Sequence, residues 1–481
     1  MRTLSRLLSL FSLVQFAILA WAYGDPAVIT KIIEEGKNNN QVMNHLRYLT
    51  QEIGPRLTGS PNLQRACEWT LAKFKEFGLS NCHLEQWGEI PVGFERGKRQ
   101  IARMVEPIVR EFEFTTRAWS AGTNGLVRGQ AVLEPRTMEE LERVRPLLEG
   151  AWIVGRPASR VQSEEERELR QKINDALNAA GIAGRVVSSR SELVITSGSF
   201  RNLDYNNLPK DVSITIRKSD YDAIVEQIIK GKKVVLEFDI ENRFIKGPVP
   251  VYNVIAEIPG TEKPDEIVIV GGHLDSWDGP GSQGCCDNGT GTMCALEAAR
   301  LLMVSGAKPK RTIRFILFTG EEQGLLGSLA YVNQHANELD KISAVFIDDG
   351  GTNYCGGLTC IEPMAEILKH ATDPVNQAFP EMQVKIQTVP QMPRGGGSDH
   401  VSFNQKGVPG FFWHEVGRAN YTYVHHTQYD RYEQAIPEYL MQSSVAAAVT
   451  AYNMACAETL LPREKRTGMP QSRLASFIPM F

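Results

Sequence analysis

The sequence predicts an α/β fold with a mostly parallel or mixed central sheet and helices on both faces. From residue 248 onward, apolar strand-like segments alternate with helical segments, and several charged residues follow directly after those strands. Residues 122–247 differ in character and interrupt this pattern. Strands are expected at 252–258, 266–270, 312–319, 342–347 and 407–413, and helices at 290–304 and 327–335.

Residues 122–247 are predicted to form an inserted, mostly β domain. The length of 481 residues indicates two domains or one domain with a large insertion. Short strand-like runs at 129–133, 150–154, 193–196, 212–216 and 233–238 accompany one charged helix at 163–180, without a plausible catalytic cluster. We divide the chain into a signal peptide (1–22), a lead-in or pro-segment (23–45), a first catalytic part (46–121), the inserted domain (122–247), a second catalytic part (248–462) and a C-terminal tail (463–481).

The N-terminus is typical of an exported protein. Arg2 and Arg6 precede an apolar run at 7–20, and Ala20-Trp21-Ala22 matches the small-x-small pattern of a cleavage site. An uncleaved membrane anchor is the alternative, but the run is shorter than the ~20 apolar residues that a span needs. We therefore expect cleavage after Ala22, no stable membrane insertion afterwards, and a secreted protein, or a periplasmic or lysosomal one depending on the organism.

The composition argues against a nucleic-acid partner. The chain has 52 Lys and Arg against 56 Asp and Glu, a net charge of −4, whereas nucleic-acid-binding domains usually carry a basic excess. The 42% hydrophobic and 22% charged content is that of a globular protein. Eight cysteines in an exported chain can pair, but the sequence does not reveal the pairing.

Candidate metal ligands stand where the predicted strands end. The carboxyl ends of parallel strands meet at one edge of a sheet, and carboxylates gathered there repel one another unless cations neutralise them. An Asp at a strand end is more often a simple cap, so the joint placement carries the prediction of a metal site. Mixed His and carboxylate ligands suit zinc, although manganese or cobalt also fits. The residues are His273 and Asp275 after 266–270, Glu321 and Glu322 after 312–319, Asp348 and Asp349 after 342–347, Asp287 before the helix at 290–304, and His425 and His426 after 407–413.

Five motifs in this order resemble those of the co-catalytic two-zinc peptidase family, which includes bacterial aminopeptidases and glutamate carboxypeptidases. They are HLDSWD at 273–278, GCCDNGTG at 284–291, FTGEEQG at 318–324, DGGT at 349–352 and HHT at 425–427. The first motif, KPKRT at 308–312 and GPRLTGS at 54–60 most resemble the carboxypeptidase Q group. The chain differs from that group by a longer gap between His273 and Asp287 and by Asn288 at an acidic position.

The resemblance implies a zinc-exopeptidase sandwich, an inserted domain similar to a protease-associated domain, a homodimer and two zinc ions per chain. It implies that Asp287 bridges both ions, that His273 and Asp349 complete one site, and that Glu322 and His426 complete the other. Asp349 and His426 are preferred to their neighbours because they directly precede Gly-Gly-Thr and Thr427. Glu321 is expected to be the general base, and Asp275 to hydrogen-bond His273. Asp399 and His400 resemble the substrate-side loop of the family.

The activity implied is hydrolysis of dipeptides or short peptides, with the peptide as the only partner besides a second copy of the chain. An aminopeptidase of the same family is an alternative, because the sequence does not reveal which terminus is held. A one-metal acyltransferase similar to glutaminyl cyclase is disfavoured by the full set of five ligands. A receptor-like interaction protein without activity is disfavoured because the ligands and Glu321 are all present.

Overall fold

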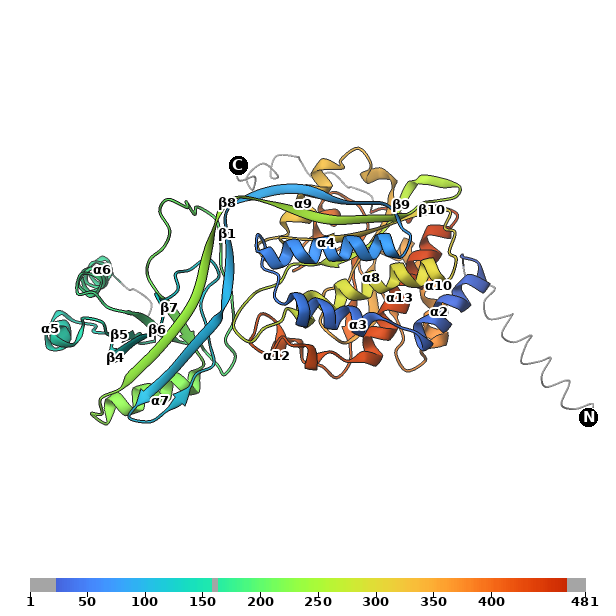
Figure 1. The fold of residues 1–481 in the computed structure, drawn as a ribbon. Helices are drawn as coiled ribbons and strands as arrows, with labels where there is room; N and C mark the ends of the chain where they lie inside the picture. The colour runs from blue at the N-terminus through green and yellow to red at the C-terminus, as the bar shows by residue number, and fades with distance from the viewer. Residues whose placement is uncertain (1–22, 158–162, 465–481) are drawn as a thin grey trace, which may run out of the picture.

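The computed structural model describes residues 23–157 and 163–464 and has two units joined by a long hairpin (Figure 1). Strands β1 (Ser80–Glu106) and β8 (Val235–Ile258) pair antiparallel from the larger unit into the smaller one. The signal peptide predicted at 1–22 and nearly all of the tail predicted at 463–481 lie outside the described residues. No helix among the described residues is long and apolar enough to cross a membrane.

The larger unit has a mixed, mostly parallel sheet with helices on both faces, which confirms the predicted fold class. Its strands follow the order β14-β11-β9-β10-β8, in which only the β10–β8 pair is antiparallel. A three-stranded sheet with the order β13-β12-β15 lies beside it. The strands are β9 (Lys263–His273), β10 (Arg311–Phe318), β11 (Ile342–Ile347), β12 (Tyr354–Cys360), β13 (Lys385–Thr388), β14 (Gly410–Phe412) and β15 (His414–Val416).

Alternate residues of the central strands pack against different helices. Val268 and Val270 belong to one core cluster, and Ile267 and Ile269 to another, as expected for strands covered on both faces. The first cluster includes α2 (Pro26–Asn38), α3 (Val42–Arg47), α4 (Pro61–Glu76), α8 (Thr290–Val304), α10 (Glu362–Ala378) and α13 (Pro437–Cys456). The second includes α9 (Leu326–Gln334) and α11 (His400–Gln405); the short α12 (Tyr421–Val424) precedes the histidine pair.

The smaller unit, which we define as residues 107–234 with the adjoining part of the hairpin, contains more helix than predicted. Its strands β4 (Val127–Leu133), β5 (Trp152–Val154), β6 (Gly184–Ser188) and β7 (Ser213–Ile216) are parallel, and β3 (Phe114–Thr115) pairs antiparallel with β7. The short β2 (Arg110–Glu111) pairs with β1. Helices α5 (Met138–Val144) and α6 (Glu164–Ala179) pack in one core cluster, and α7 (Lys218–Ile229) in another. The strand expected at 193–196 is absent; Ile195 makes only an isolated bridge to Thr427.

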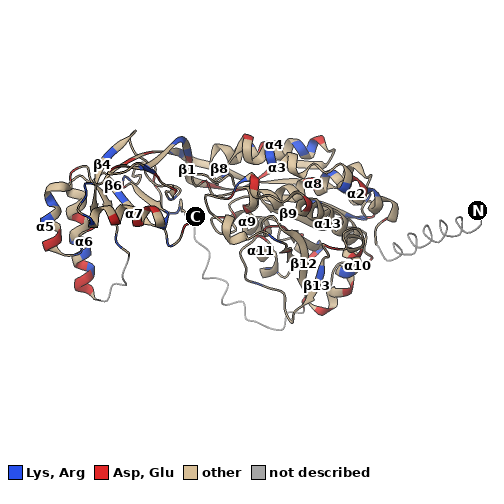
Figure 2. Ribbon diagram, turned by 90° about the horizontal axis from the view of Figure 1, so that it is seen from below, with Lys and Arg blue, Asp and Glu red and all other residues tan. Residues whose placement is uncertain are grey.

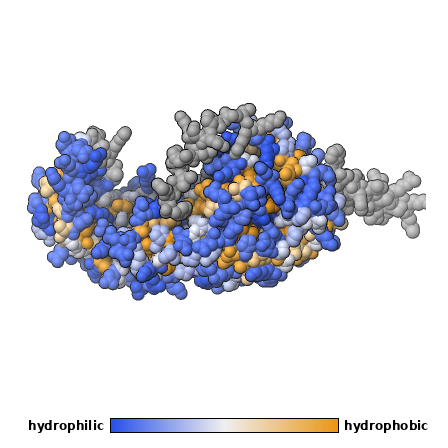
Figure 3. Space-filling view, turned by 90° about the horizontal axis from the view of Figure 1, so that it is seen from above, coloured by the Kyte–Doolittle hydropathy of each residue, from blue (hydrophilic) through white to orange (hydrophobic). Residues whose placement is uncertain are grey.

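Charged and hydrophobic residues are distributed over both units. Basic and acidic residues are interspersed (Figure 2). On the face shown in Figure 3, hydrophilic residues cover most of the surface, and hydrophobic residues form smaller patches between them.

All eight cysteines lie within the described residues, and none of them forms a disulfide bond.

Candidate metal centre

The carboxyl ends of β9, β10 and β11 meet at one edge of the sheet, and the predicted ligands gather there. His273 ends β9, while Glu322 and Asp349 follow β10 and β11. Asp287 lies in a π-helical turn (Cys285–Gly289) that leads into α8, and His426 follows α12 with a positive φ of 61°. The structure therefore brings together five residues that are up to about 150 positions apart in the sequence.

The two carboxylate oxygens of Asp287 face two different histidines. Its Oδ1 lies 3.4 Å from His273 Nε2, and its Oδ2 lies 3.2 Å from His426 Nε2. His273 Nε2 is also 3.1 Å from Asp349 Oδ1, and His426 Nε2 is 3.0 Å from Glu322 Oε2. Ligands held at about 2.0–2.2 Å from a tetrahedral zinc are themselves roughly 3.3–3.6 Å apart. These separations suit two ions that share Asp287.

The protonation of His273 supports a cation at this position. His273 Nδ1 lies 3.0 Å from the carbonyl oxygen of Asp275, which only accepts, so Nδ1 carries a proton. In a neutral ring the Nε2 lone pair then faces the oxygens of Asp349 and Asp287, an arrangement that needs a cation or a second proton. Asp287 Oδ2 and Glu322 Oε1 are buried and have no hydrogen-bond partner. The residues therefore fit a metal.

Asp275 contacts His273 differently from the prediction. The hydrogen bond to His273 comes from the Asp275 main chain, and the Asp275 carboxylate is 3.6 Å from Nδ1. That carboxylate instead accepts the backbone N–H groups of Glu321 and Glu322, each at 3.3 Å. Asp275 therefore fixes the loop that carries Glu321 and Glu322 as well as the orientation of His273.

Two histidines are close enough to Asp287 to be considered as ligands. His425 Nε2 is 4.0 Å from Asp287 Oδ2, and the three donor atoms of Asp287, His425 and His426 lie within 4.8 Å of one another. The side chain of His425 is 49% exposed, whereas that of Glu322 is 3% exposed and closer to His426. Distance and burial therefore favour Glu322 with His426 as the second pair.

Burial sets the pKa values in this cluster. Burial raises the pKa of Glu322 to about 7, and the charge of Asp287 adds to the effect. Burial also holds the pKa of Glu321 well above its usual range, against the nearby His273, and Asp349 adds to the rise. Burial lowers the pKa of His426, but contacts with Asp287 and Glu322 outweigh it and raise the pKa to about 10. These shifts describe an excess of negative charge that protons or cations must neutralise.

Asp399 and His400 lie at the start of α11, close to this cluster. Both oxygens of Asp399 and His400 Nδ1 are buried without a hydrogen-bond partner. Burial raises the pKa of Asp399 to about 7, while burial lowers the pKa of His400 to about 4.

Asn288, which replaces an acidic residue of the carboxypeptidase Q pattern, donates to the Asp348 carbonyl at 2.7 Å. An ionised carboxylate has no proton to donate there.

Several residues that hold the site were not predicted. Thr58 donates its hydroxyl to Asp275 Oδ2 at 3.0 Å. Arg56 is fully buried and donates to the carbonyls of Leu274 and Gly284, which flank the loop between His273 and Asp287. Asp430 accepts the backbone N–H of Cys286, next to Asp287, at 2.5 Å. The motif at 54–60 marked Arg56 and Thr58, but it gave no indication of partners more than 200 positions away.

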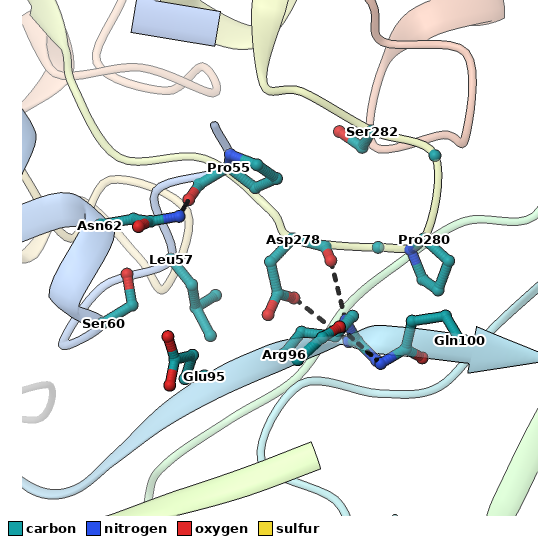
Figure 4. Close-up of a pocket in the computed structure, with 13 residues that line it drawn as sticks. Pro55, Leu57, Ser60, Asn62, Glu95, Arg96, Gln100, Asp278, Pro280 and Ser282 are labelled. Carbon is teal, nitrogen blue, oxygen red and sulfur yellow. Dashed lines mark hydrogen bonds and ion pairs between the residues drawn. The ribbon is translucent and has the colours of Figure 1, made fainter. Parts of the chain in front are cut away.

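The loop after Asp275 is tied to the hairpin beside a cavity of about 210 Å³ (Figure 4). Arg96 of β1 donates to the carbonyl of Asp278 at 2.8 Å and to its carboxylate at 3.2 Å. Both side chains are less than a tenth exposed. None of the five predicted ligands lines this cavity. The feature that bears on the metal site is therefore the contact between Arg96 and Asp278, which holds the loop after Asp275.

Comparison with known proteins identifies the family. The model of peptidase family M28 matches residues 253–451. Carboxypeptidase Q of Mus musculus is 30% identical over 447 residues, which cover 92% of this chain and 91% of the mouse protein. The chain belongs to peptidase family M28. It is therefore a metallopeptidase.

Further proteins are similar to this chain in sequence or in fold. Human carboxypeptidase Q is 28% identical over 446 residues, with 92% and 91% of the two chains covered. The crystal structure of a peptidase M28 precursor from Shewanella amazonensis has a TM-score of 0.65 at 24% identity and covers 91% of this chain and 98% of its own. A zinc aminopeptidase from Bacillus subtilis has a TM-score of 0.54 at 20% identity, with 86% and 94% covered. The two solved structures support the fold.

Proposed function

We propose that this M28 peptidase is an exported two-zinc exopeptidase that hydrolyses dipeptides or short peptides. Asp287 would serve both ions, His273 and Asp349 would hold one, and Glu322 and His426 would hold the other. The observation that carries this proposal is the placement of His273 Nε2 and His426 Nε2 at 3.4 and 3.2 Å from opposite oxygens of Asp287. The zinc aminopeptidase of similar fold and the carboxypeptidase Q relatives support zinc and peptide hydrolysis.

Glu321 is the general base in this proposal. Bound zinc supplies a water of lowered pKa and polarises the scissile carbonyl. Glu321 takes the proton of the attacking water and delivers it to the departing amine. Its side chain is suited to this exchange, because burial raises its pKa and Asp275 fixes the backbone of Glu321 and Glu322. Asp399 and His400, at the start of α11, lie on the substrate side of the site in this proposal.

Metal analysis combined with kinetics tests the proposal. We expect two zinc ions per wild-type chain and hydrolysis of unblocked dipeptides. Glu321→Gln retains the metal and loses at least about 100-fold in kcat, because general-base catalysis contributes about 10²- to 10⁴-fold. Val416→Ala, at an exposed position of β15, is the control and retains both properties. A wild-type chain that binds no metal, or a Glu321→Gln variant with full activity, would overturn the proposal.

The remaining parts of the proposal concern assembly and processing. We propose cleavage after Ala22, residues 122–247 as an inserted domain similar to a protease-associated domain, and a homodimer as the working assembly. The carboxypeptidase Q relatives, which match over 92% of the chain, support a shared domain plan. An M28 aminopeptidase remains the second candidate, since a solved aminopeptidase from Aneurinibacillus shares the fold with a TM-score of 0.52.

A further inference from the structure

A cavity of about 380 Å³ lies in the smaller unit, and its lining includes none of the five predicted metal ligands. The lining comes from the carboxyl ends of β4 and β5, from β6 and from α6. In units of parallel strands and helices, ligands usually bind beyond the carboxyl ends of the strands. The volume also falls within the range of small-molecule sites, about 300–1,000 Å³.

The cavity is open because the first half of α6 does not pack closely on the sheet. Ile173 and Leu177 in the second half are buried, in the core cluster that includes Ile153 of β5. Leu169 lies one turn earlier on the same stripe of the helix, but it is only partly buried and lines the cavity. Val187 of β6 is likewise partly buried and lines it. Apolar surface is therefore left uncovered on both the helix and the sheet.

A charged side chain stands on the face of the sheet that α6 covers. Helices α5 and α6 lie on one side of this sheet and α7 on the other (Figure 1). Arg185 of β6 pairs in register with Ile153 of β5, so both side chains lie on the side of α6, whereas Val186 belongs to the core beside α7. Strands with helices on both faces usually carry apolar side chains at such positions. The cavity gives Arg185 room that a packed helix would not.

Positive charge exceeds negative charge around the cavity. Arg170 and Glu166 form an ion pair of 2.5 Å with each other. Glu134 accepts the backbone N–H of Arg156 at 3.1 Å. Both glutamates are thus engaged by the protein, and the excess charge comes from the remaining arginines. The charged residues that line the cavity are Arg136, Arg156, Arg170, Arg185, Glu134 and Glu166.

Two of these arginines have donors available for a ligand. Within the described part of the chain, no carboxylate lies at ion-pair distance from the guanidinium of Arg185, which donates to the amide oxygen of Asn178 at 3.1 Å. Arg156 lies 3.6 Å from Glu140, and its Nε is buried without a hydrogen-bond partner. A guanidinium carries five N–H donors, so both arginines keep unused ones. Its planar fork matches the oxygens of a carboxylate or a phosphate.

We propose that this cavity binds a small organic anion, whose carboxylate or phosphate group is held by Arg156 and Arg185 and whose apolar part lies against Leu169 and Val187. Both oxyanions accept hydrogen bonds from the same donors, and the apolar surface favours an anion with a hydrocarbon part over an inorganic ion. The site goes beyond the proposed peptidase function and does not depend on it. It gives the smaller unit a ligand of its own.

Three probes that share one aromatic ring test this site on the full chain. Calorimetry measures the affinities of benzoate, phenyl phosphate and the neutral benzyl alcohol. We expect the preferred anion to bind at least about 10-fold more tightly than the alcohol, because the charged group strengthens the hydrogen bonds. Whether benzoate or phenyl phosphate binds more tightly identifies the oxyanion.

Substitutions at the cavity assign this binding to the arginines. Arg185→Gln should weaken the preferred anion about 10- to 100-fold, as for a lost hydrogen bond between charged groups, and leave the alcohol unchanged. Arg143→Gln, an exposed arginine on α5, is the matched control and changes no affinity. Circular dichroism checks that each variant is folded.

A second variant separates this cavity from the proposed metal centre, where anions can also bind. Leu169→Trp fills the cavity without changing a charge and should abolish binding of the preferred anion. In the wild type, the bound anion should slow hydrogen exchange at the amides of Arg156 and Arg185, which donate to Glu134 and Val212. The proposal is overturned if neither anion binds, if the three probes bind equally, or if both Arg185→Gln and Leu169→Trp bind the anion as the wild type does.

Discussion

His335 on the side of the sheet away from α8 offers a residue-scale test of the electrostatics. Its Nε2 lies 2.8 Å from Glu85 Oε2, and its Nδ1 lies 3.0 Å from Glu338 Oε1. Hydrogen bonds that the protonated ring donates to Glu338 and Glu85 raise the pKa of His335 from 6.5 to about 9. A histidine with a raised pKa stabilises the native state fully below the unfolded pKa of about 6.5, and the stabilisation is lost as the pH rises through about 9.

We therefore expect His335→Gln to lower the free energy of unfolding by about 1–2 kcal/mol more at pH 6 than at pH 10. The shift alone corresponds to roughly 3 kcal/mol, but the side chain is 25% exposed and solvent screens part of it. Urea denaturation of the wild type and the variant at both pH values measures the difference. The lost stacking on Tyr331 acts at both pH values and cancels. The same destabilisation at pH 6 and pH 10 would contradict the ion pairs.

The sequence revealed those residues of the site that follow strands. His273, Glu322 and Asp349 were found because each comes directly after a predicted strand, and the structure brings them together with Asp287 and His426 at 3.0–3.4 Å. Thr58 and Arg56 were not found, because each depends on partners far away in the chain, the Asp275 carboxylate and the carbonyls of Leu274 and Gly284. Local patterns do not contain such pairings, and only the folded chain supplies them.

At the scale of elements, α2 tests whether the lead-in region belongs to the folded core. Ile29 and Ile32 of this helix are completely buried, and Gly36 packs so closely that an added Cβ would lie 2.2 Å from Val445 of α13. We expect Ile32→Ala to lower the free energy of unfolding by about 2–4 kcal/mol, the usual range for a large apolar side chain in a core. Thermal or urea unfolding measures this loss.

The matched control on the same helix is Glu34→Ala, an exposed position where we expect a change within about 0.5 kcal/mol. If Ile32→Ala were as mild as this control, α2 would be a loosely attached segment, as the prediction of a pro-segment allows. A large difference between the two variants would place α2 in the core of the enzyme.

Strands were easier to predict than the elements around them. The strands β9, β10 and β11 each contain an apolar run of at least four residues with charged residues beyond its end, a pattern typical of buried parallel strands. Helix α13 was missed because it is buried on nearly all sides and therefore lacks a polar face with a period of 3.6 residues. The full length of β8 was missed because Gly247, Pro248 and Pro250 interrupt its pattern, although the strand continues through them in the hairpin.

At the scale of the whole molecule, the loop that carries His426 connects the metal centre to the smaller unit. Thr196 of the smaller unit donates its N–H to the carbonyl of His426, whose side chain faces Asp287 and Glu322. In the proposed two-zinc enzyme, chelation would free that side chain and leave the buried carboxylates to repel one another. We expect this repulsion to loosen the loop of His426 and, through its carbonyl, the segment 194–201.

The effect of metal chelation should therefore be measurable at amides far from the metal ligands. Zinc at about 1,000 times its dissociation constant stabilises the native state by about 4 kcal/mol, so chelation lowers the melting temperature of the full chain. Hydrogen exchange should show faster exchange at the Thr196 amide after chelation, while the amides of β5 and β6 keep their wild-type rates. A lowered melting temperature without faster exchange at Thr196 would mean that the smaller unit holds this segment independently of the metal. Faster exchange at Thr196 together with unchanged β5 and β6 would show that metal binding orders the segment 194–201, so that the proposed zinc ions organise both the catalytic centre and the part of the smaller unit that contacts it.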